Sequence, residues 1–168
     1  MTGSSSSKLI LILHDIRSAH NVGSIFRTAD GAGVDEIILS GYSPVPPKKG
    51  ALYLSDADKA LKKTALGAEE SVIWKKRKSL ARLLQSLKKE GYDILALEQS
   101  KESVDYREYA YSGKIALVVG NEVRGVDTKI LASCDAILEI HMYGKKNSLN
   151  VSVATGIALY QITATMKK

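Results

Sequence analysis

The chain has 168 residues, with 24 lysines and arginines against 18 aspartates and glutamates, which gives a formal net charge of +6 and a pI near 9.3. This length predicts a single domain, and 45% hydrophobic with 25% charged residues excludes a chain that is disordered throughout. The single cysteine, Cys134, excludes a disulfide scaffold and indicates a reducing compartment. No apolar stretch approaches the roughly 18 residues of a membrane span, so we expect a cytoplasmic protein without a membrane segment.

Residues 1–7 are too polar for a signal peptide, and we expect them to be a disordered start or a cloning remnant. Residues 8–168 then form the single domain. The excess of positive charge is compatible with a polyanionic partner, but a pI of this size is also common in proteins that bind no nucleic acid.

Short apolar runs alternate with longer helical patterns along the chain. Six such runs predict strands, over residues 9–13, 36–39, 72–74, 93–97, 115–119 and 136–140. Several are apolar throughout, which is typical of strands covered on both faces. Apolar spacing predicts part of a helix over 25–32, a helix over 79–89 that Ser79 caps, and the longest helix over 149–166. This alternation predicts an α/β fold with a mostly parallel, six-stranded sheet and helices on both faces.

All three prolines lie in residues 41–50, directly after the second predicted strand. Such a segment is neither a central strand nor a helix, so it is expected to be an exposed, semi-rigid loop. It is either a plain connector or a loop that faces the substrate, since ligands of open α/β sheets bind at the carboxyl ends of strands.

Two common nucleotide-binding motifs are absent. Gly120 and Gly125 have the spacing of a P-loop, but Val126 and Asp127 stand where that motif requires lysine and a hydroxyl residue. The segment after the first strand, residues 14–20, contains no glycine-rich dinucleotide fingerprint.

The cysteine and the histidines do not suggest a metal site or a nucleophile. His14, His20 and His141 are scattered, and one cysteine makes no cluster, so we expect no metal. Cys134 has no histidine near it in sequence, and small buried packing is the favoured interpretation over a nucleophile.

Three polar segments follow predicted strands. In residues 21–29, Asn21 stands near the start of a helix, where it either caps the helix or binds a ligand. Arg27 lies six residues later, about 120° around the helix from Asn21 at roughly 100° per residue. A capping asparagine and a solvated arginine explain this segment equally well.

The second and third segments also combine polar residues with glycines. In residues 118–126 an apolar strand ends at Gly120 and then delivers Glu122, and a carboxylate at this end of a strand is typical of α/β enzymes. In residues 140–152 a loop of glycine, lysine and asparagine leads to Ser148, where the last helix is expected to start. The alternative for residues 118–126 is a polar turn, and the alternative for residues 140–152 is a loop with a helix cap.

In this order, the three segments resemble the motifs of the SpoU/TrmH-type branch of the SPOUT class of RNA 2′-O-ribose methyltransferases, over nearly the whole chain. The resemblance implies a C-terminal trefoil knot and a homodimer with the active site near the subunit interface. It also implies that S-adenosylmethionine binds in the knot loops, largely through main-chain groups. By position, the cofactor contacts fall at Leu97, Gly120, Ile140, Met142, Ser148 and Leu149.

The implied reaction moves a methyl group from S-adenosylmethionine to a ribose 2′-hydroxyl of tRNA or rRNA. Arg27 matches the family's catalytic arginine, and since a guanidinium does not deprotonate in proteins, we expect it to position a phosphate and stabilise alkoxide charge. Glu122 is expected to orient Arg27 or another cation, and Asn21 to hold the ribose or the loop. Ser148 and Asn150 are expected to shape the cofactor and 2′-hydroxyl site.

The chain departs from the family at His141, where relatives commonly carry a proline, and this is expected to alter the rigidity of the cofactor loop. With no added RNA-binding domain, RNA recognition is expected at the dimer surface. The candidate phosphate contacts are Arg27, Lys48, Lys49, Lys145 and Lys146, whereas residues 75–78 with Arg82, Lys88 and Lys89 are interpreted as the solvent side of an amphipathic helix.

Three alternatives remain beside a 2′-O-ribose methyltransferase. The first is a non-catalytic dimeric RNA-binding protein that retains the fold. The second is an α/β enzyme that acts on a small nucleotide, and the third is methylation of a base instead of the ribose.

Overall fold

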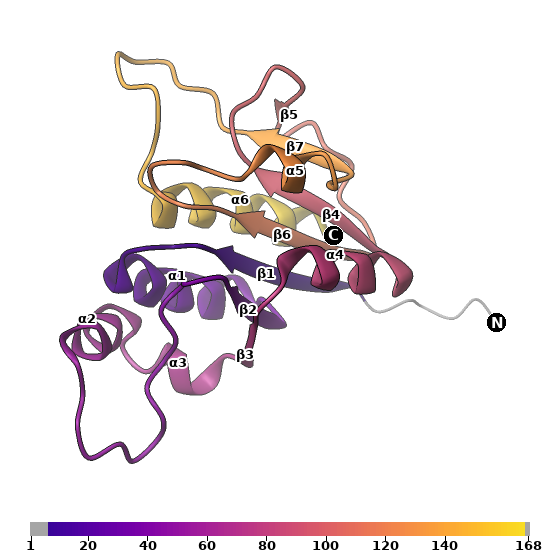
Figure 1. Cartoon of the computed structure of the whole chain (residues 1–168). Helices are drawn as coiled ribbons and strands as arrows, with labels where there is room; N and C mark the ends of the chain where they lie inside the picture. The colour runs from indigo at the N-terminus through magenta and orange to yellow at the C-terminus, as the bar shows by residue number, and fades with distance from the viewer. Residues whose placement is uncertain (1–6, 167–168) are drawn as a thin grey trace.

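A computed structural model describes residues 7–166, so the expectation for residues 1–7 lies outside the described residues except at Ser7. Figure 1 shows one sheet with helices against both of its sides. The strands are β1 (Lys8–His14), β2 (Glu36–Ser40), β3 (Trp74–Arg77), β4 (Tyr92–Leu97), β5 (Val104–Asp105), β6 (Lys114–Val119) and β7 (Ala136–Glu139). They lie in the order β3-β2-β1-β6-β4-β7-β5, and every pairing is parallel.

The expected α/β fold with a parallel sheet is confirmed, but the expected number of strands is wrong. The sheet has seven strands because β5, only two residues long, pairs with β7 at one edge. Two residues are too few to produce any periodicity in a sequence.

The third strand is displaced from its predicted position, and residues 75–77 belong to it instead of to a helix. Val72 is the C-cap of helix α3, and the next residue, Ile73, accepts through its carbonyl from the Ile37 N–H of β2, so the strand begins at Trp74. The lysines are tolerated because β3 is an edge strand, where charged side chains reach solvent. Lys75 Nζ lies 2.6 Å from Glu36 Oε1, and Lys76 Nζ donates to the Ser43 carbonyl at 2.7 Å.

The helices are α1 (Ala19–Ala32), α2 (Asp56–Ala65), α3 (Ala68–Ser71), α4 (Leu80–Lys89), α5 (Thr128–Leu131) and α6 (Val151–Met166). The Ser79 cap is confirmed, since its side chain accepts from the Arg82 N–H. The longest described helix is α6, as expected, but it begins at Val151 and not at Ser148. Asn150 supplies the first-turn contact, because its Oδ1 accepts from the Ser152 N–H at 2.9 Å.

Alternate strand residues pack into two cores, one on each face of the sheet. Leu11 and Ile37 point to the face covered by α1, α2, α3 and α6, whereas Ile12 and Ile38 point to the face covered by α4. Gly23 lets α1 approach α2, since a Cβ there would lie 2.2 Å from the Leu61 carbonyl oxygen. Helices therefore cover both faces, as predicted.

Cys134 packs against the core on the α4 face. Burial raises the pKa of its thiol to about 11, and its Sγ donates to the Ile130 carbonyl. A thiol that stays protonated at neutral pH supports the packing role. Among residues 7–166, no helix has the length and apolar character needed to cross a membrane.

Candidate active site at the carboxyl edge of the sheet

A cavity of about 310 Å³ lies where β4, β6 and β7 end. The loops that follow these three strands line it, together with residues 147–149 and the first turn of α6. This edge is where ligands bind in open α/β sheets. The cavity brings together all six residues expected at the cofactor: Leu97, Gly120, Ile140, Met142, Ser148 and Leu149.

Glu122 also lines the cavity and connects it to the start of α1. Its Oε2 accepts from the Arg17 N–H at 2.9 Å, and its Oε1 accepts from the Ser18 N–H and from Asn21 Nδ2, both at 3.0 Å. Burial by itself raises the pKa of this carboxyl, but the hydrogen bonds from Arg17, Asn21 and Ser18 outweigh it and hold the pKa below its ordinary value. Glu122 is therefore an ionised side chain that is already fully engaged in positioning the chain around it.

A second hydrogen bond extends this arrangement to the last polar segment. Asn150 Nδ2 donates to Asn21 Oδ1 at 3.2 Å, so Glu122, Asn21 and Asn150 form a continuous series of contacts. The three residues lie more than 25 positions apart in the chain, and each belongs to a different polar segment. The structure thus joins the three segments at one place.

Arg27 lies elsewhere. Because α1 begins at Ala19, Asn21 and Arg27 are both within the helix and point in different directions. Arg27 borders a separate hollow of about 650 Å³, which it shares with Lys63 and Tyr160. No ion pair joins Arg27 to Glu122 within residues 7–166, so the expected orientation of Arg27 by Glu122 is not found inside one chain.

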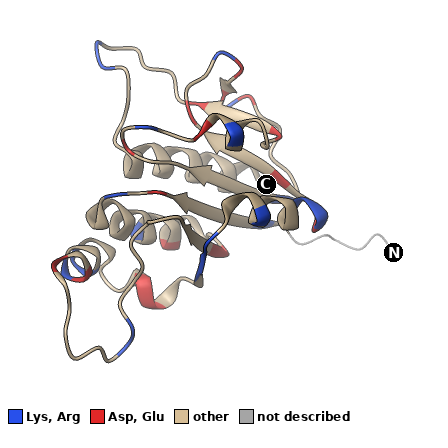
Figure 2. Ribbon diagram, in the orientation of Figure 1, with Lys and Arg blue, Asp and Glu red and all other residues tan. Residues whose placement is uncertain are grey.

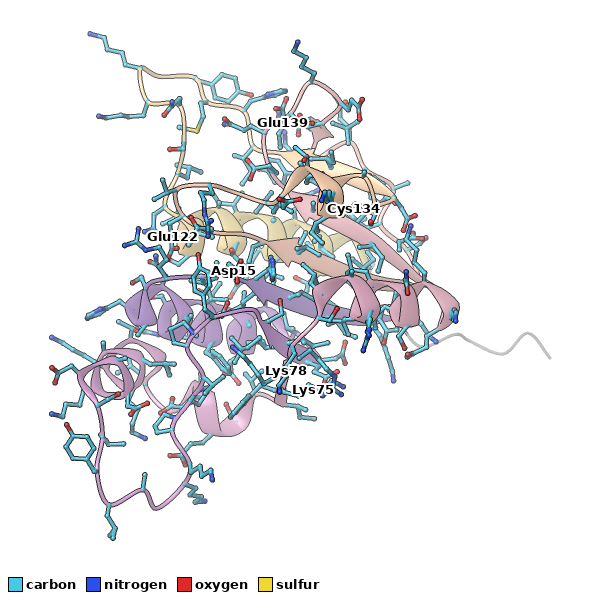
Figure 3. The ribbon with its side chains drawn as sticks, in the orientation of Figure 1. Asp15, Lys75, Lys78, Glu122, Cys134 and Glu139 are labelled. Atoms are coloured by element: carbon cyan, nitrogen blue, oxygen red, sulfur yellow. The ribbon has the colours of Figure 1, made fainter. Side chains whose placement is uncertain are left out.

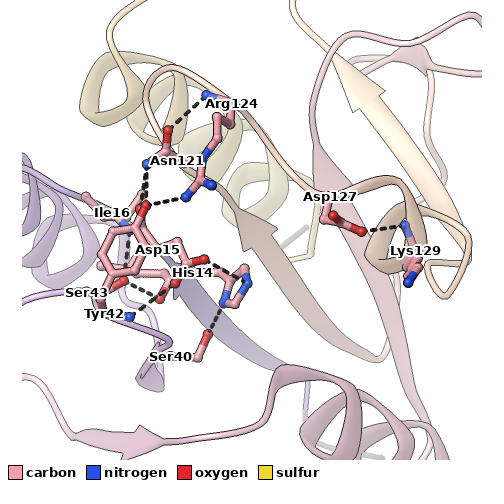
Figure 4. Close-up of polar contacts among 11 residues, drawn as sticks. His14, Asp15, Ile16, Ser40, Tyr42, Ser43, Asn121, Arg124, Asp127 and Lys129 are labelled. Atoms are coloured by element: carbon pink, nitrogen blue, oxygen red, sulfur yellow. Dashed lines mark hydrogen bonds and ion pairs between the residues drawn. The ribbon is translucent and has the colours of Figure 1, made fainter.

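Asn121 is a residue of the site that the sequence analysis missed. It is 6% exposed, and its Nδ2 donates to the Asp15 carbonyl at 2.9 Å and to the Tyr42 hydroxyl at 2.8 Å (Figure 4). Its Oδ1 accepts from the N–H groups of Val123 and Arg124. Asn121 therefore ties together the loops that follow β1, β2 and β6. Its position in the sequence, directly after Gly120 and next to Glu122, could have indicated that Asn121 belongs to the site.

The glycines beside Asn121 are required by the turn itself. A Cβ on Gly120 would lie 2.6 Å from the Gly125 carbonyl oxygen, and Gly125 has a φ of +68°. The turn is closed by two hydrogen bonds between the main chains of Asn121 and Gly125, at 2.9 and 3.2 Å. The expectation that these glycines permit backbone geometry that other residues resist is confirmed, and the tight turn between Asn121 and Gly125 is the reason why glycine is needed at both positions.

His141 is held by carboxylates beside the cavity. Its Nδ1 lies 3.0 Å from Glu139 Oε1 and its Nε2 lies 3.5 Å from Asp105 Oδ2. Asp105 also accepts two hydrogen bonds from the Arg107 guanidinium, which hold the pKa of its carboxyl well below the ordinary range. These contacts anchor the loop after β7 at His141, beside the cavity.

His14 takes part in a Ser-His-Asp arrangement that cannot serve as a nucleophilic triad. Its Nδ1 lies 2.8 Å from Ser40 Oγ and its Nε2 lies 3.5 Å from Asp15 Oδ2 (Figure 4). Ser40 is fully buried, so no substrate can reach its oxygen. Among residues 7–166, no three histidine, cysteine or acidic side chains are grouped so that they could hold a metal ion.

The four lysines expected to contact RNA are exposed on two loops (Figure 2). Lys48 and Lys49 lie on the proline segment, which is a loop after β2 as predicted. Lys145 and Lys146 lie on the loop between β7 and α6, near the tip. The two pairs stand on loops that project from different ends of the molecule.

These features define an α/β protein whose site is built by three loops at the carboxyl edge of its sheet. The model of the SpoU rRNA Methylase family matches residues 8–160, and the chain belongs to this family. The chain is 34% identical over 153 residues to a Staphylococcus saprophyticus protein whose name places it in the TrmH family of tRNA/rRNA methyltransferases. That match covers 91% of this chain and 57% of the relative, so the chain spans little more than half the length of such relatives.

Solved structures agree with this assignment. A TrmH/SpoU tRNA modifying enzyme of A. aeolicus is 34% identical, with a TM-score of 0.79, 94% of this chain covered and 75% of that one. An AdoMet-bound rRNA methyltransferase of Sinorhizobium meliloti is 26% identical, with a TM-score of 0.81 and coverages of 94% and 56%. A structure concerned with the 2-OH methylation of C/U34 on tRNA is 28% identical, with a TM-score of 0.76 and coverages of 94% and 95%. The resemblance inferred from the three polar segments is confirmed.

Proposed function

We propose that this protein uses S-adenosylmethionine to methylate a ribose 2′-hydroxyl of tRNA or rRNA. The observation that carries the proposal is the cavity at the carboxyl edge, which is lined by all six expected cofactor residues and by Glu122, in a chain of the SpoU family. The AdoMet-bound relative supports the cofactor, and the relative concerned with 2-OH methylation of tRNA supports the ribose.

The residues present fit the cofactor. Leu97, Leu138 and Leu149 give the otherwise polar cavity an apolar part of its wall, which suits a flat aromatic base. Glu98 and Glu139 add carboxylates, which favour a ligand with a positive charge. When bound, the cofactor supplies a methyl group on a positively charged sulfur. Main-chain groups of the loops around Gly120 and Ile140 would hold it.

The chain's own polar residues then position the acceptor. Glu122, with its lowered pKa and three hydrogen bonds, is a weak proton acceptor, so we assign it the role of holding Asn21 and the start of α1. Ser148 lines the cavity and Asn150 contacts Asn21, which suits both for contacts with the 2′-hydroxyl. Arg27 and Lys63 border one hollow and suit a backbone phosphate.

The separation of Arg27 from the cavity supports a homodimer. We assign Arg27 to the cavity of the neighbouring copy, so that each site is completed across the interface. Val153 and Tyr160 on α6 are exposed apolar side chains beside both regions and suit burial between two copies. We further propose a trefoil knot formed by the loops after β6 and β7, and activity in the cytoplasm.

The test is transfer of labelled methyl groups from S-adenosylmethionine to bulk tRNA and bulk rRNA. We expect incorporation into one of them, with the label on the ribose after digestion to nucleosides. Arg27→Ala is expected to abolish transfer and to leave cofactor binding, measured by calorimetry, nearly unchanged.

Other outcomes would identify the alternatives. RNA binding with neither cofactor binding nor incorporation would indicate the non-catalytic RNA-binding protein. A label on the base would contradict the 2′-O assignment, and loss of cofactor affinity in Arg27→Ala would contradict the role given to Arg27.

A further inference from the structure

A second hollow lies on the other face of the sheet, away from the candidate site. It has a volume of about 570 Å³ and runs between β1, β2 and β3 on one side and α4 on the other. We call it the β3–α4 groove. Its basic side chains are Lys8, Lys75, Arg77, Lys78 and Arg82.

The groove concentrates positive charge. Its lining holds five basic and two acidic residues, a net charge of +3, which is half of the +6 of the whole chain. One of the acids, Glu36, is already paired with Lys75. Within residues 7–166, Lys8, Arg77, Lys78 and Arg82 form no ion pair with a carboxylate. Four cations are therefore available to an anionic ligand.

The floor of the groove argues against an apolar partner. Ile10 and Ile38 of the sheet and Leu87 of α4 lie there, and all three are buried in the core. A ligand would reach only the charged and polar rim. A phosphodiester backbone fits such a rim because its charges lie on its outside and need no apolar pocket.

One end of the groove lies at the same edge of the sheet as the candidate site, and the other end lies at the amino ends of β1 and β2, beside Lys8 and Glu36. Arg77 is the last residue of β3 and Lys78 follows it, so both stand at the carboxyl edge of the sheet, where Glu122 follows β6 (Figure 3 labels Lys78 and Glu122). Three strand intervals separate β3 from β6, and at about 4.8 Å each they span about 14 Å. An RNA strand of a few nucleotides covers this distance.

We propose that the β3–α4 groove binds the phosphate backbone of the substrate RNA several nucleotides from the methylated ribose. This inference rests on the proposed function for the identity of the RNA. It gives Lys78 and Arg82 a role in binding that is separate from the chemistry at the cavity.

The test compares two variants that each remove three positive charges. The groove variant is Arg77→Gln, Lys78→Gln and Arg82→Gln. The matched control is Lys59→Gln, Lys89→Gln and Lys129→Gln, all exposed and all outside the groove. Binding of bulk tRNA and of bulk rRNA is measured without cofactor over a series of salt concentrations, and thermal melting checks that both variants fold.

We expect the groove variant to flatten the plot of log Kd against log salt by about 2, since each phosphate contact contributes roughly 0.7 to this slope for a single strand. Its KM for RNA should rise about tenfold, with kcat at saturating RNA and cofactor affinity unchanged. The control should keep the wild-type slope.

Equal slopes of log Kd against log salt in the two variants would overturn the inference and would indicate an acidic protein as the partner of the groove. The outcome is distinct from failure of the proposed function. A flattened salt slope in the groove variant, without any methyl transfer by the wild type, would refute the methyltransferase and retain the groove. Methyl transfer by the wild type, with an unchanged slope in the groove variant, would retain the methyltransferase and refute the groove.

Discussion

Glu122 illustrates how one side chain organises several loops. Its two oxygens accept three hydrogen bonds, two of them from N–H groups at the entrance to α1, where a negative charge is favoured by the helix dipole. Because these donors hold the pKa of Glu122 below its ordinary value, the carboxylate stabilises the folded state. That stabilisation is complete above the pKa of the unfolded chain and is lost as the pH falls through the lower pKa of the folded chain.

Glu122→Gln tests this role. The amide presents an N–H group where the carboxylate accepts one, so we expect a loss of about 1–3 kcal/mol in the free energy of unfolding at pH 7. The difference from wild type should shrink below pH 4.5, the ordinary value for this group. Urea unfolding at pH 7 and at lower pH measures it. Glu102→Gln, at an exposed position, is the control, and a pH-independent difference for Glu122→Gln would contradict the argument.

At the scale of elements, the loop between β7 and α6 depends on the edge strand β5. Asp105 of β5 contacts His141, and its partner Arg107 also donates to the Tyr143 hydroxyl at 3.3 Å. This edge therefore contacts the loop on both sides of Met142, at His141 and Tyr143, and Met142 lines the cavity together with Ile140. These contacts restrain the loop at His141 and Tyr143.

Asp105→Asn should weaken this anchor without touching the cavity lining. We expect the affinity for S-adenosylmethionine to fall roughly 2- to 30-fold, the range for residues that act through a connected network. Affinity for RNA in the absence of cofactor should stay the same. Calorimetry measures the first and a filter assay the second, with Glu108→Gln as the control in the same exposed turn. An unchanged cofactor affinity would show that β5 does not position the loop.

At the scale of the whole molecule, one chain does not bring Arg27 to the cavity. The cavity and the hollow that contains Arg27 both border α6, the cavity at Val151 and Ala154 and the hollow at Tyr160. A two-fold arrangement of chains over this helix would give each cavity the arginine of its neighbour.

Mixing two inactive variants tests this arrangement. Arg27→Ala removes the arginine, and Ser148→Trp fills the cavity. If sites are completed across the interface, mixed dimers contain one intact site, and random pairing restores about a quarter of the wild-type activity. Methyl transfer by the unfractionated co-expressed protein measures it, and the purified mixed dimer should reach about half of the wild-type activity. Activity no higher than that of either parent in confirmed mixed dimers would place Arg27 at the site of its own chain.

Much of the fold could be predicted because long apolar runs mark buried strands. β1, β2, β4, β6 and β7 lie within about one residue of their predicted positions. The elements that were missed or displaced lack such a signal. β5 is two residues long, β3 is rich in lysine, and α2 buries only Leu61 and Ala65.

The candidate site was predicted as a set of residues but not as an arrangement. The three polar segments indicated Asn21 and Glu122, and the resemblance added Asn150. Spacing on one helix also indicated that Arg27 and Asn21 do not face the same way. The partners of Glu122 are mostly main-chain N–H groups, which leave no mark in a sequence. Asn121 was overlooked because its partners, Asp15 and Tyr42, come from two other loops.

The class of fold could be predicted from the order of apolar runs and helical patterns, which depend on neighbouring residues. The family and the six residues expected at the cofactor followed from the resemblance of the three polar segments. Which of these residues touch, where Arg27 lies, and that Lys75 and Arg77 stand on a strand beside a groove instead of on a helix followed only from the folded chain. These depend on the order of strands in the sheet, which brings together β3, β1 and β6 from distant parts of the chain. A net charge of +6 is compatible with many arrangements of charge on a surface. In the folded chain, the residues that line the β3–α4 groove carry a net charge of +3, which is half of it.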